Sequence, residues 1–374
     1  MKIAVLLSRI LVGGLFIFSG LIKANDPVGF SIKLDEYFAV FGMDWLTPAS
    51  LILSILISVG EIVLGVALFI GARIKLVSWL LLGMIIFFTW LTGYSAVTGS
   101  VTDCGCFGDA IKLTPWESFS KDIVLLVLIS IIFWKHKLIK PVFSVNTNSL
   151  ILSTSAALFT IFCLYCLWHL PVQDFRAYKV GANIPVLMTI PDDAPLAQYK
   201  TIFTLKNKTT SAEKEFENDL PGDYTENWEY ISRTDKMISE GYKPLVKDFA
   251  ATDAQGNDYT DLILENPAPM LWIISHDLKS ANLKVQNQIV QLTNKLEKEG
   301  VMTIGLTASP AADVDEFIKQ NGIQFPYYFM DATTLKTIVR ANPGIVLVKN
   351  GVVMAKWHHS DLPSLEQIKK DHLN

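Results

Sequence analysis

Five long apolar segments in the first half of the chain constrain its fold more than any other feature. A helix needs about 20 mostly apolar residues to cross the hydrocarbon core of a membrane. The segments cover residues 3–24, 48–70, 76–94, 123–134 with its flanks, and 150–170. The fourth is the shortest, but Thr114, Pro115 and Glu117 form a capping box that marks a helix start just before it. The sequence therefore predicts a membrane protein with five helical spans.

Beyond residue 171 the composition changes. Residues 172–374 carry mixed charges, turn residues and alternating patterns, which are typical of a soluble α/β domain. We predict a four-helix membrane domain (1–143), a fifth transmembrane helix (144–171), a β-rich extension or linker (172–245) and an α/β domain (246–374). The net charge of −4 and the lack of a basic stripe argue against nucleic acid as a partner.

The distribution of lysine and arginine predicts the orientation of the helices. Basic residues gather at the N-terminus and in the loops after the second and fourth spans, whereas residues 25–45 and 95–119 carry more acid than base. Because cytoplasmic loops are the basic ones, we expect a cytoplasmic N-terminus in a bacterial-type inner or plasma membrane. The α/β domain is then extracytoplasmic (periplasmic). Arg9 and the lack of an Ala-x-Ala site favour an uncleaved first helix over a signal peptide.

Two cysteines, Cys104 and Cys106, lie one residue apart in the glycine-rich outer loop of residues 102–109. Gly105 lets the backbone bend so that the two sulfurs can meet. A disulfide across one residue closes a small, strained ring, and strained disulfides have the oxidising potentials typical of catalytic bridges. The pair is the candidate catalytic site for thiol–disulfide chemistry, and a static clip that only fixes the loop is the alternative. Two cysteines without a nearby histidine do not make a zinc site, so no metal is predicted.

A second pair, Cys163 and Cys166, lies in the fifth span, roughly 6 to 11 Å below the outer interface at ~1.5 Å per residue. A relay that passes electrons between the two pairs is geometrically conceivable. Cysteine also packs readily as a small apolar residue, and a mid-helix position does not activate a thiolate as a helix N-terminus does. The sequence leaves both readings open, and packing is the more ordinary one.

Four charged residues lie within spans or at their ends, where charge is costly and often functional. Arg9 and Glu61 fall at similar depth on the inner side, which predicts an ion pair that holds two helices in register and is too deep to serve the outer thiols. Lys23 and Asp122 fall at outer helix ends, level with the cysteine loop. Lys23 could favour a thiolate and Asp122 could move protons. Alternatively, Lys23 snorkels to water and Asp122 only favours its helix N-terminus.

Several short motifs stand out among these residues. They are Arg9-x-x-x-Gly13, Phe16-x-x-Ser19-Gly20-x-x-Lys23, Gly60-Glu61, Asp103-Cys104-Gly105-Cys106-Phe107-Gly108 and Lys121-Asp122. Together they resemble the MauE branch of the DoxX-like membrane proteins over the first 140 positions. The resemblance implies a four-helix bundle with a redox-associated role, since MauE itself is linked to maturation of methylamine dehydrogenase, in which many disulfides must form. Nothing in the sequence points to methylamine.

Strands and helices alternate from residue 246 on, in an order that resembles a thioredoxin-like fold. The expected elements are an opening hairpin (247–251 and 258–264), a strand (270–275), a helix (280–299), a strand (301–307), a helix (312–321) and a final hairpin (345–349 and 352–357). The final hairpin turns at Asn350-Gly351, which is a strong hairpin signal. Asn342-Pro343 resembles the cis-proline of that family.

The outer domain lacks the dithiol of thioredoxins. Where that family carries Cys-x-x-Cys, residues 275–280 read Ser-His-Asp-Leu-Lys-Ser, and no cysteine follows Cys166. The domain is therefore expected to bind or dock rather than to exchange thiols. His276 could do acid–base work, but an exposed loop histidine is the simpler reading. His358 and His359 point to opposite faces of a strand and make a poor chelating pair.

The leading hypothesis is a membrane oxidoreductase or electron relay that acts on thiols or disulfides of an extracytoplasmic protein. No cofactor motif is evident, and a membrane quinone is one electron acceptor that suits the location. The rival is a non-enzymatic assembly or scaffold protein, whose outer domain binds a partner while the bundle anchors it. Small-molecule transport is a weaker third reading, because the spans show no inverted repeat.

Overall fold

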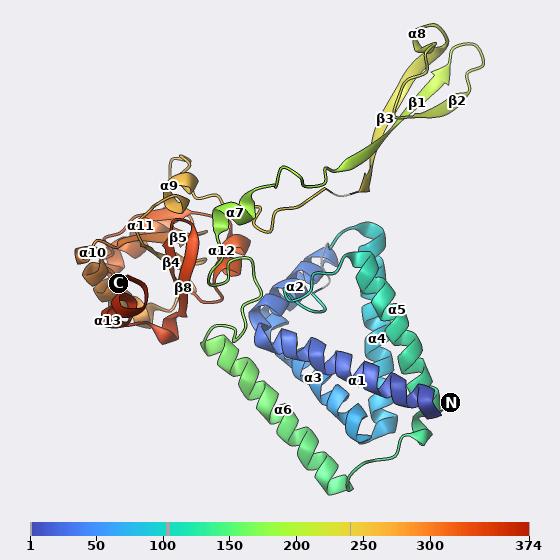
Figure 1. Ribbon diagram of the computed structural model, residues 1–374, viewed down its shortest axis with the longest axis horizontal. Coiled ribbons are helices and arrows are strands. Elements are labelled where there is room, and N and C mark those ends of the chain that lie inside the picture. The colour runs from blue at the N-terminus through green and yellow to red at the C-terminus, as the bar shows by residue number, and fades with distance from the viewer. Residues whose placement is uncertain (1, 102–104, 240, 374) are drawn as a thin grey trace. The chain divides into compact units, whose positions relative to one another are not determined.

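The computed structural model describes residues 2–101, 105–239 and 241–373, and the chain separates into two compact units. The first unit joins Met1–Ala182 to Ala250–Asn374, and the second is Asn183–Phe249. A helical bundle forms the start of the first unit and an α/β domain forms its end (Figure 1).

Short connections join the helices of the bundle. The bounds are α1 Lys2–Asn25, α2 Pro27–Val40, η1 Asp44–Ala49, α3 Ser50–Ile70, α4 Ile74–Thr98, α5 Pro115–Lys135, η2 His136–Leu138 and α6 Val145–Trp168. Helix α2 lies where only a polar loop was expected. Its start is nevertheless marked in the sequence, because Asp26 accepts a hydrogen bond from the Gly29 N–H at 2.8 Å and Pro27 takes the first helical position.

Close backbone contact holds α1 against α3. A Cβ atom added at Gly20 would lie 2.7 Å from the Ser58 carbonyl oxygen, and one added at Gly65 would lie 2.8 Å from the Gly13 carbonyl oxygen. Residue numbers rise along α1 as they fall along α3, so the two helices run antiparallel. Small residues allow such approach where lipid, rather than water, surrounds the helices. The glycines therefore set the register of the two helices.

Four helical stretches among the described residues are long and apolar enough to cross a membrane. They are α1, η1 together with α3, α4, and α6. The remaining expected span forms helix α5, which is 21 residues long and begins with the expected capping box at Thr114. Glu117, Lys121 and Asp122 lie in its first two turns and lower its apolar character. The chain is a membrane protein, and α5 is the polar-ended member of its bundle.

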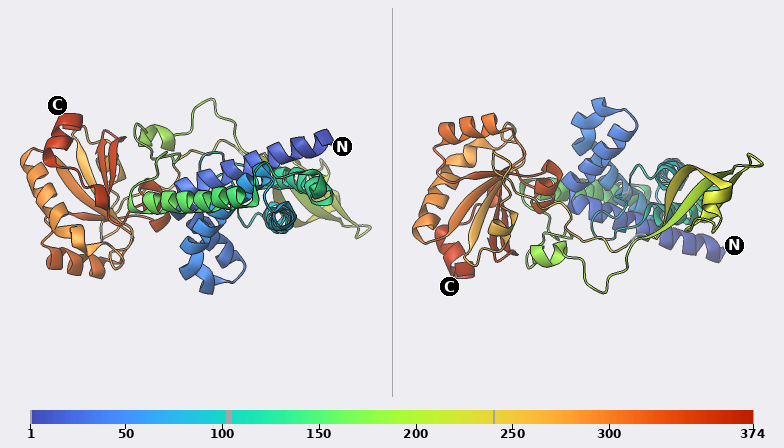
Figure 2. Two further views of the ribbon diagram at one scale, coloured as in Figure 1. Left: turned by 90° about the horizontal axis from the view of Figure 1, so that it is seen from below. Right: turned by 90° about the horizontal axis from the view of Figure 1, so that it is seen from above.

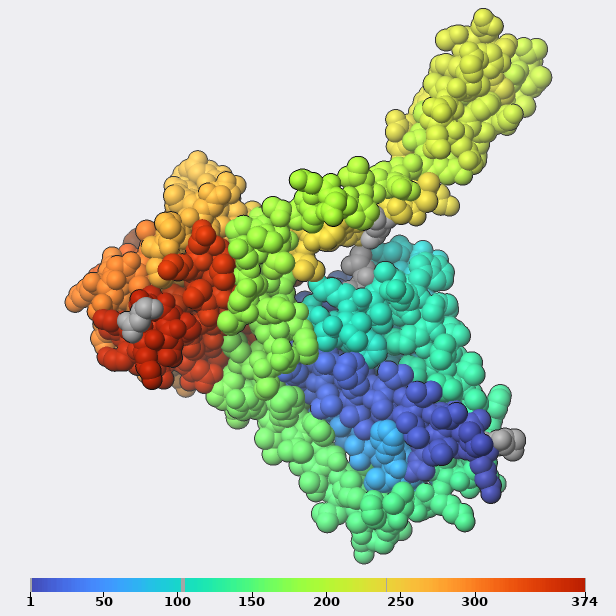
Figure 3. Space-filling model, viewed as in Figure 1, coloured from blue at the N-terminus to red at the C-terminus, as the bar shows by residue number. Residues whose placement is uncertain are grey.

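The second unit is a three-stranded antiparallel sheet with the order β2-β1-β3. Its elements are α7 Ile184–Met188, β1 Gln198–Asn207, β2 Glu213–Glu217, α8 Tyr224–Asn227 and β3 Trp228–Ser239. The sheet is a slender ribbon (Figure 3), and every residue of β3 after Trp228 is exposed. Only Leu205 of β1 is fully buried among its described strand residues.

The α/β domain is built on a five-stranded sheet with the order β6-β5-β4-β7-β8. Its elements are α9 Thr260–Leu264, β4 Met270–Ser275, η3 Leu283–Val285, α10 Gln286–Lys298, β5 Met302–Thr307, α11 Ala311–Asn321, β6 Tyr327–Phe329, α12 Ala332–Ile338, β7 Gly344–Lys349, β8 Val352–His358, η4 His359–Asp361, α13 Leu365–Ile368 and η5 Lys369–Leu373. Strands β4, β5 and β6 run parallel, β7 runs antiparallel to β4, and β8 runs antiparallel to β7. Helices cover the sheet (Figure 2), and all six residues of β4 are buried. This arrangement confirms the predicted thioredoxin-like domain.

Local signals were read correctly at the end of this domain and incorrectly at its start. The Asn342–Pro343 peptide bond is cis, and Asn350 (φ 49°) and Gly351 (φ 70°) form the turn between β7 and β8 with two positive φ angles. The expected opening hairpin is wrong, because residues 260–264 are helical. The Asp258 side chain accepts a hydrogen bond from the Thr260 N–H at 2.8 Å, which turns the chain into that helix.

A buried charge cluster ties residues 172–182 to the α/β domain. Asp174 accepts hydrogen bonds from Arg176 Nε at 2.8 Å and from Lys356 Nζ of β8 at 3.0 Å. The Gly181 N–H donates to the Val353 carbonyl oxygen at 2.8 Å, which adds this segment to the edge of β8. These bonds explain why the separate sheet unit begins at residue 183 rather than at the expected residue 172.

The glycine contact between α1 and α3 gives a first prediction. We expect Gly20→Ala to lower thermal stability in detergent, since overpacking costs about 1–3 kcal/mol. Gly14 lies in the same helix with nothing within 4 Å of an added Cβ atom, so Gly14→Ala is the matched control. It is expected to be neutral or to gain up to about 1 kcal/mol from helix propensity. Equal melting temperatures for the two variants would contradict this account of the register.

The charge cluster gives a second prediction, on pH. Burial alone would raise the pKa of Asp174, but Arg176 and Lys356 outweigh it and lower that pKa to about 2 from the ordinary 3.8. A carboxylate with a depressed folded-state pKa adds stability that is present above about pH 4 and lost as pH falls toward 2. We expect Asp174→Asn to melt lower at pH 7, and its deficit to shrink between pH 4 and 2. A deficit that is constant with pH would contradict the assignment.

Candidate functional site

The loop between α4 and α5 carries the predicted cysteine pair. Cys104 lies outside the described residues, whereas Cys106 is half-buried and Phe107 is buried. Gly105 has a φ of 68° and Gly108 a φ of 50°, and the Gly108 N–H donates to the Gly105 carbonyl oxygen at 3.2 Å. Positive φ angles suit glycine far better than other residues. The glycines therefore permit the tight turn that presents Cys106.

A buried ion pair lies directly beneath this loop. Lys23 Nζ of α1 donates to both carboxylate oxygens of Glu61 of α3, at 2.6 and 2.8 Å. Each residue is only 3–4% exposed. Charges this deeply buried are tolerated when they are paired and hydrogen-bonded. The pair is therefore the polar centre of the bundle.

A hydrogen-bond chain connects the ion pair to the cysteine loop. Lys23 Nζ also donates to Ser19 Oγ at 2.9 Å, and Ser19 Oγ donates to the Cys106 carbonyl oxygen at 2.9 Å. With Glu61 taking two bonds, all three ammonium protons of Lys23 are used. Lys23 is therefore linked to the Cys106 carbonyl oxygen through Ser19. Ser19 was named only as part of a motif and was given no role from the sequence, although it lies four residues before Lys23 on the same helix face.

A second charged pair lies on α5. Asp122 is 1% exposed, and it accepts hydrogen bonds from Lys121 Nζ at 2.5 Å and from Thr92 Oγ1 of α4 at 3.0 Å. Lys121 Nζ also lies 5.4 Å from the centroid of the Phe107 ring. The hydrogen bond from the Thr92 hydroxyl to Asp122 was not predicted, because nothing in the local sequence of α4 indicates that Thr92 contacts α5.

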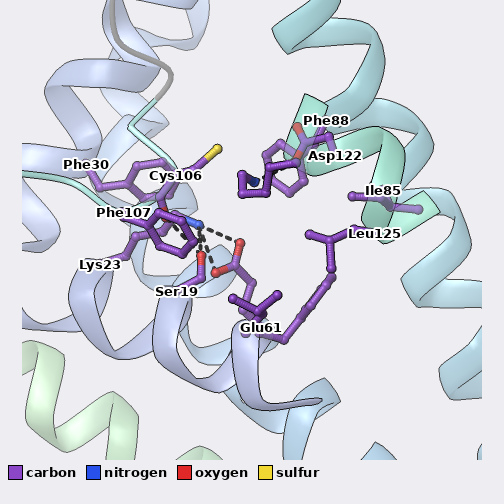
Figure 4. Close-up of a pocket in the computed structure, with 13 residues that line it drawn as sticks. Ser19, Lys23, Phe30, Glu61, Ile85, Phe88, Cys106, Phe107, Asp122 and Leu125 are labelled. Atoms are coloured by element: carbon purple, nitrogen blue, oxygen red, sulfur yellow. Dashed lines mark hydrogen bonds and ion pairs between the residues drawn. The ribbon is translucent and has the colours of Figure 1, made fainter. Parts of the chain in front are cut away.

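The two charged pairs and the cysteine loop line one cavity (Figure 4). Lys23, Ser19 and Glu61 lie together in Figure 4, and Asp122 lies across from them beside Phe88. Apolar side chains complete the lining: Leu15, Phe16, Phe30, Ile85, Phe88, Phe107 and Leu125. The cavity volume is about 40 Å³, which has room for a few water molecules.

This arrangement can hold and move protons beside a cysteine. Two carboxylates and two ammonium groups share the cavity, so its formal charge is balanced. Lys23 Nζ is also 5.1 Å from the Phe30 ring centroid and 5.7 Å from that of Phe88, and ring faces stabilise a desolvated cation. Among the described residues, no three His, Cys, Asp or Glu side chains are grouped to hold a metal ion.

The predicted Arg9–Glu61 ion pair is wrong. Arg9 Nε donates to the Leu68 carbonyl oxygen at 2.8 Å, and its Nη2 donates to the carbonyl oxygen of Phe69. Depths counted from the ends of the apolar segments had placed Arg9 and Glu61 level. The glycine contacts instead place Arg9 beside the last turn of α3. That turn lies about 12 Å along α3 from Glu61, at ~1.5 Å per residue. Glu61 is thereby left to Lys23 and lies in the same cavity as Cys106.

The second cysteine pair faces other helices. Cys163 and Cys166 of α6 are buried free thiols. Cys163 packs with Ala24 of α1 and Ile62 of α3, and neither cysteine is part of the cavity lining. The packing reading has direct contacts in its favour, and the relay stays a prediction.

The histidines of the α/β domain are more enclosed than expected. His276 is half-buried, and burial, with Lys336 nearby, lowers its pKa to about 4. It is therefore neutral at pH 7 rather than an ordinary exposed loop histidine. Burial, with His359 adjacent, likewise lowers the pKa of His358 to about 4. His359 Nδ1 lies 3.1 Å from the carbonyl oxygen of Pro343.

Comparison with known families finds one match, to the bundle. Residues 1–135 match the model of the family described as methylamine utilisation protein MauE. No curated protein matches the chain.

Two solved structures show weak likeness. One is BsSco, a member of the Sco family of cytochrome c oxidase assembly proteins, in which a disulfide switch was identified. The identity is 14%, the match covers 34% of this chain and 90% of that chain, and the TM-score is 0.28. The other is the hypothetical protein SMc02350 from Sinorhizobium meliloti 1021, with 16% identity, 28% and 63% covered, and a TM-score of 0.23. Scores this low add nothing to the topology seen in the sheet.

The buried ion pair gives a third prediction. Glu61→Gln leaves Lys23 buried without its counter-charge, which typically costs about 3–5 kcal/mol. The matched control is Glu36→Gln, which breaks the partly exposed Lys33–Glu36 pair of α2 and is expected to cost less than about 1 kcal/mol. Thermal unfolding in detergent measures both. Similar losses in the two variants would show that the Lys23–Glu61 pair does not anchor the bundle.

Proposed function

We propose that this chain is a membrane thiol–disulfide oxidoreductase in which Cys104 and Cys106 exchange a disulfide with an extracytoplasmic protein. The observation that carries the proposal is the hydrogen bond from Ser19 to the Cys106 carbonyl oxygen. It links the cysteine loop directly to a buried, charged cavity. A loop that served only as a clip would need no such connection.

The chemistry balances in two electrons. A thiolate of the partner attacks a sulfur of the Cys104–Cys106 disulfide, and the mixed disulfide is resolved by the partner's second thiol. The partner gains a disulfide, and the chain gains two thiols and the two protons that the partner lost. Reoxidation of the two thiols passes two electrons and two protons to an acceptor. The proposed acceptor is a membrane quinone, which is reduced to a quinol. Exchange of this kind depends on thiolate fraction and access.

The cavity residues divide this work. Lys23 places a fixed positive charge near the loop, and a nearby cation favours a thiolate. Asp122 is the proposed proton acceptor and donor, because it is the carboxylate of α5 that lines the same cavity. Glu61 keeps Lys23 in place. Room for a few water molecules lets protons pass between these groups without a side chain crossing the space.

The proposed topology sets the partner. A cytoplasmic N-terminus and a periplasmic cysteine loop follow from the charges of the loops, and disulfides persist in that compartment. The partner is then a periplasmic protein with thiols or disulfides. The family description mentions methylamine utilisation, and maturation of a disulfide-rich enzyme of that kind is one role that fits the chemistry.

The redox state of the pair in membranes is the fourth prediction. Acid trapping followed by alkylation with a heavy maleimide should add two labels on Cys104 and Cys106 after dithiol treatment and none before it. Adding an oxidised quinone analogue after removal of the dithiol should abolish the two labels again.

Paired cysteine variants serve as the control. Cys163→Ser with Cys166→Ser should keep the cycle, whereas Cys104→Ser with Cys106→Ser should lose it. If the loop pair never changes state, the oxidoreductase proposal fails. If the loop variant also supports full maturation of the partner, the scaffold reading replaces it.

A further inference from the structure

We infer that Arg340 of the α/β domain is a positioning residue for the loop segment that carries Cys106, which it reaches through Asp26 and Asp109. The inference rests on the proposed function for its redox meaning. Its physical basis is a contact network between the α/β domain and the bundle within the first unit. Neither the lack of a Cys-x-x-Cys pair in the α/β domain nor the pattern of membrane helices indicated a role for Arg340.

Arg340 forms ion pairs with two carboxylates of the bundle. Its Nε lies 2.9 Å from Asp26 Oδ2 and 3.1 Å from Oδ1, and its Nη2 lies 3.8 Å from Asp109 Oδ2. Its Nη1 donates to the Lys336 carbonyl oxygen at 2.5 Å. Only 5% of the Arg340 side chain is exposed, so its charge is strongly felt by these two carboxylates.

Both carboxylates belong to segments that build the cavity. Asp109 lies three residues after Cys106 in the cysteine loop, and Asp26 lies three residues after Lys23. Asp26 also caps α2, the helix that contributes Phe30 to the cavity. The Arg340 guanidinium therefore contacts both the cysteine loop, at Asp109, and the segment after Lys23, at Asp26.

The bundle leaves space for the guanidinium at a glycine. A Cβ atom added at Gly29 would meet the Asp26 carboxylate first and would lie 2.8 Å from Arg340 Nη2, so a larger residue there would have to shift one or both of these side chains. A second tether lies beside it, because Asn25 Nδ2 donates to the Gln173 carbonyl oxygen at 2.8 Å and the Gln173 N–H donates to Asn25 Oδ1 at 3.0 Å. The contact is therefore specific in shape as well as in charge.

Arg340 comes from the edge of the domain where thioredoxin-like proteins carry their dithiol. It lies two residues before Asn342 of the cis Asn342–Pro343 bond. Asn342 Nδ2 donates to the Asp277 carbonyl oxygen at 2.7 Å, in the loop that replaces Cys-x-x-Cys. The edge that lacks a dithiol of its own thus supplies a cation to the cysteine loop of the bundle.

The test measures Cys106 reactivity directly. In the full-length chain with Cys104→Ser, Cys163→Ser and Cys166→Ser, Cys106 is the remaining thiol, and its alkylation rate is followed against pH in detergent. Arg340→Gln leaves two carboxylates near the loop without their cation, which disfavours a thiolate. We expect alkylation at pH 7 to slow about two- to five-fold, and the half-maximal rate to move to higher pH. Arg340→Lys should restore much of the rate.

A double-mutant cycle separates coupling from general damage. Asp26→Asn keeps the helix cap, because asparagine is a good cap residue, but removes the charge. If the contact acts as a unit, Arg340→Gln and Asp26→Asn together should change the rate differently from the product of their single effects. Arg233→Gln, in the exposed Arg233–Asp235 pair of β3, should change nothing.

The outcomes are distinct from those of the proposed function. An unchanged pH profile in Arg340→Gln with an unchanged melting temperature overturns the inference, and so do independent, multiplicative effects in the cycle. Because the measurement uses a single cysteine, it does not depend on whether the pair cycles. A pair that never cycles in the wild-type chain would overturn the proposed function alone.

Discussion

The Lys23–Glu61 ion pair is the interaction on which the membrane bundle depends. It joins the two helices that the glycine contacts bring together, and it lies at the base of the cavity beneath the cysteine loop. A lone charge at this depth would be far costlier than the pair. The pair also uses its remaining proton to hold Ser19, and through Ser19 the loop. In the proposed function, stability and reactivity are therefore set by the same atoms.

Patterns that span many residues predicted the architecture well. The apolar segments identified the membrane helices, and the alternation after residue 246 predicted a thioredoxin-like sheet whose strand β4 has the expected bounds of 270–275. The turn at Asn350-Gly351 was also predicted from local sequence, because it needs a backbone geometry that few residues provide, and the cis bond at Asn342-Pro343 was expected from the resemblance to thioredoxin-like proteins.

Pairings between distant segments were harder to predict. Arg9 and Glu61 look like partners when each helix is counted from its own end, but the stagger of α1 against α3 depends on where glycines meet backbone. Helix α2 depends on a single capping side chain, that of Asp26, and the turn into the short helix α9 depends on one hydrogen bond to Asp258. Such signals are weak beside hydropathy. The role of Arg340 follows only from tertiary contact, since 314 residues separate it from Asp26.

The end of α1 shows how much can be concentrated in one helical turn. Lys23 binds Glu61, Ala24 packs with Cys163, Asn25 bonds to Gln173, and Asp26 pairs with Arg340. Each residue of a helix points about 100° away from the last, so Lys23, Ala24 and Asn25 face three directions, and Asp26, the N-cap of α2, follows directly after them. Inserting or deleting one residue before this turn would rotate all four at once. The number of residues between Gly20 and Pro27 thus fixes three contacts together: the ion pair, the packing against α6 and the contact with the α/β domain. This segment therefore tolerates a substitution far better than an insertion or a deletion.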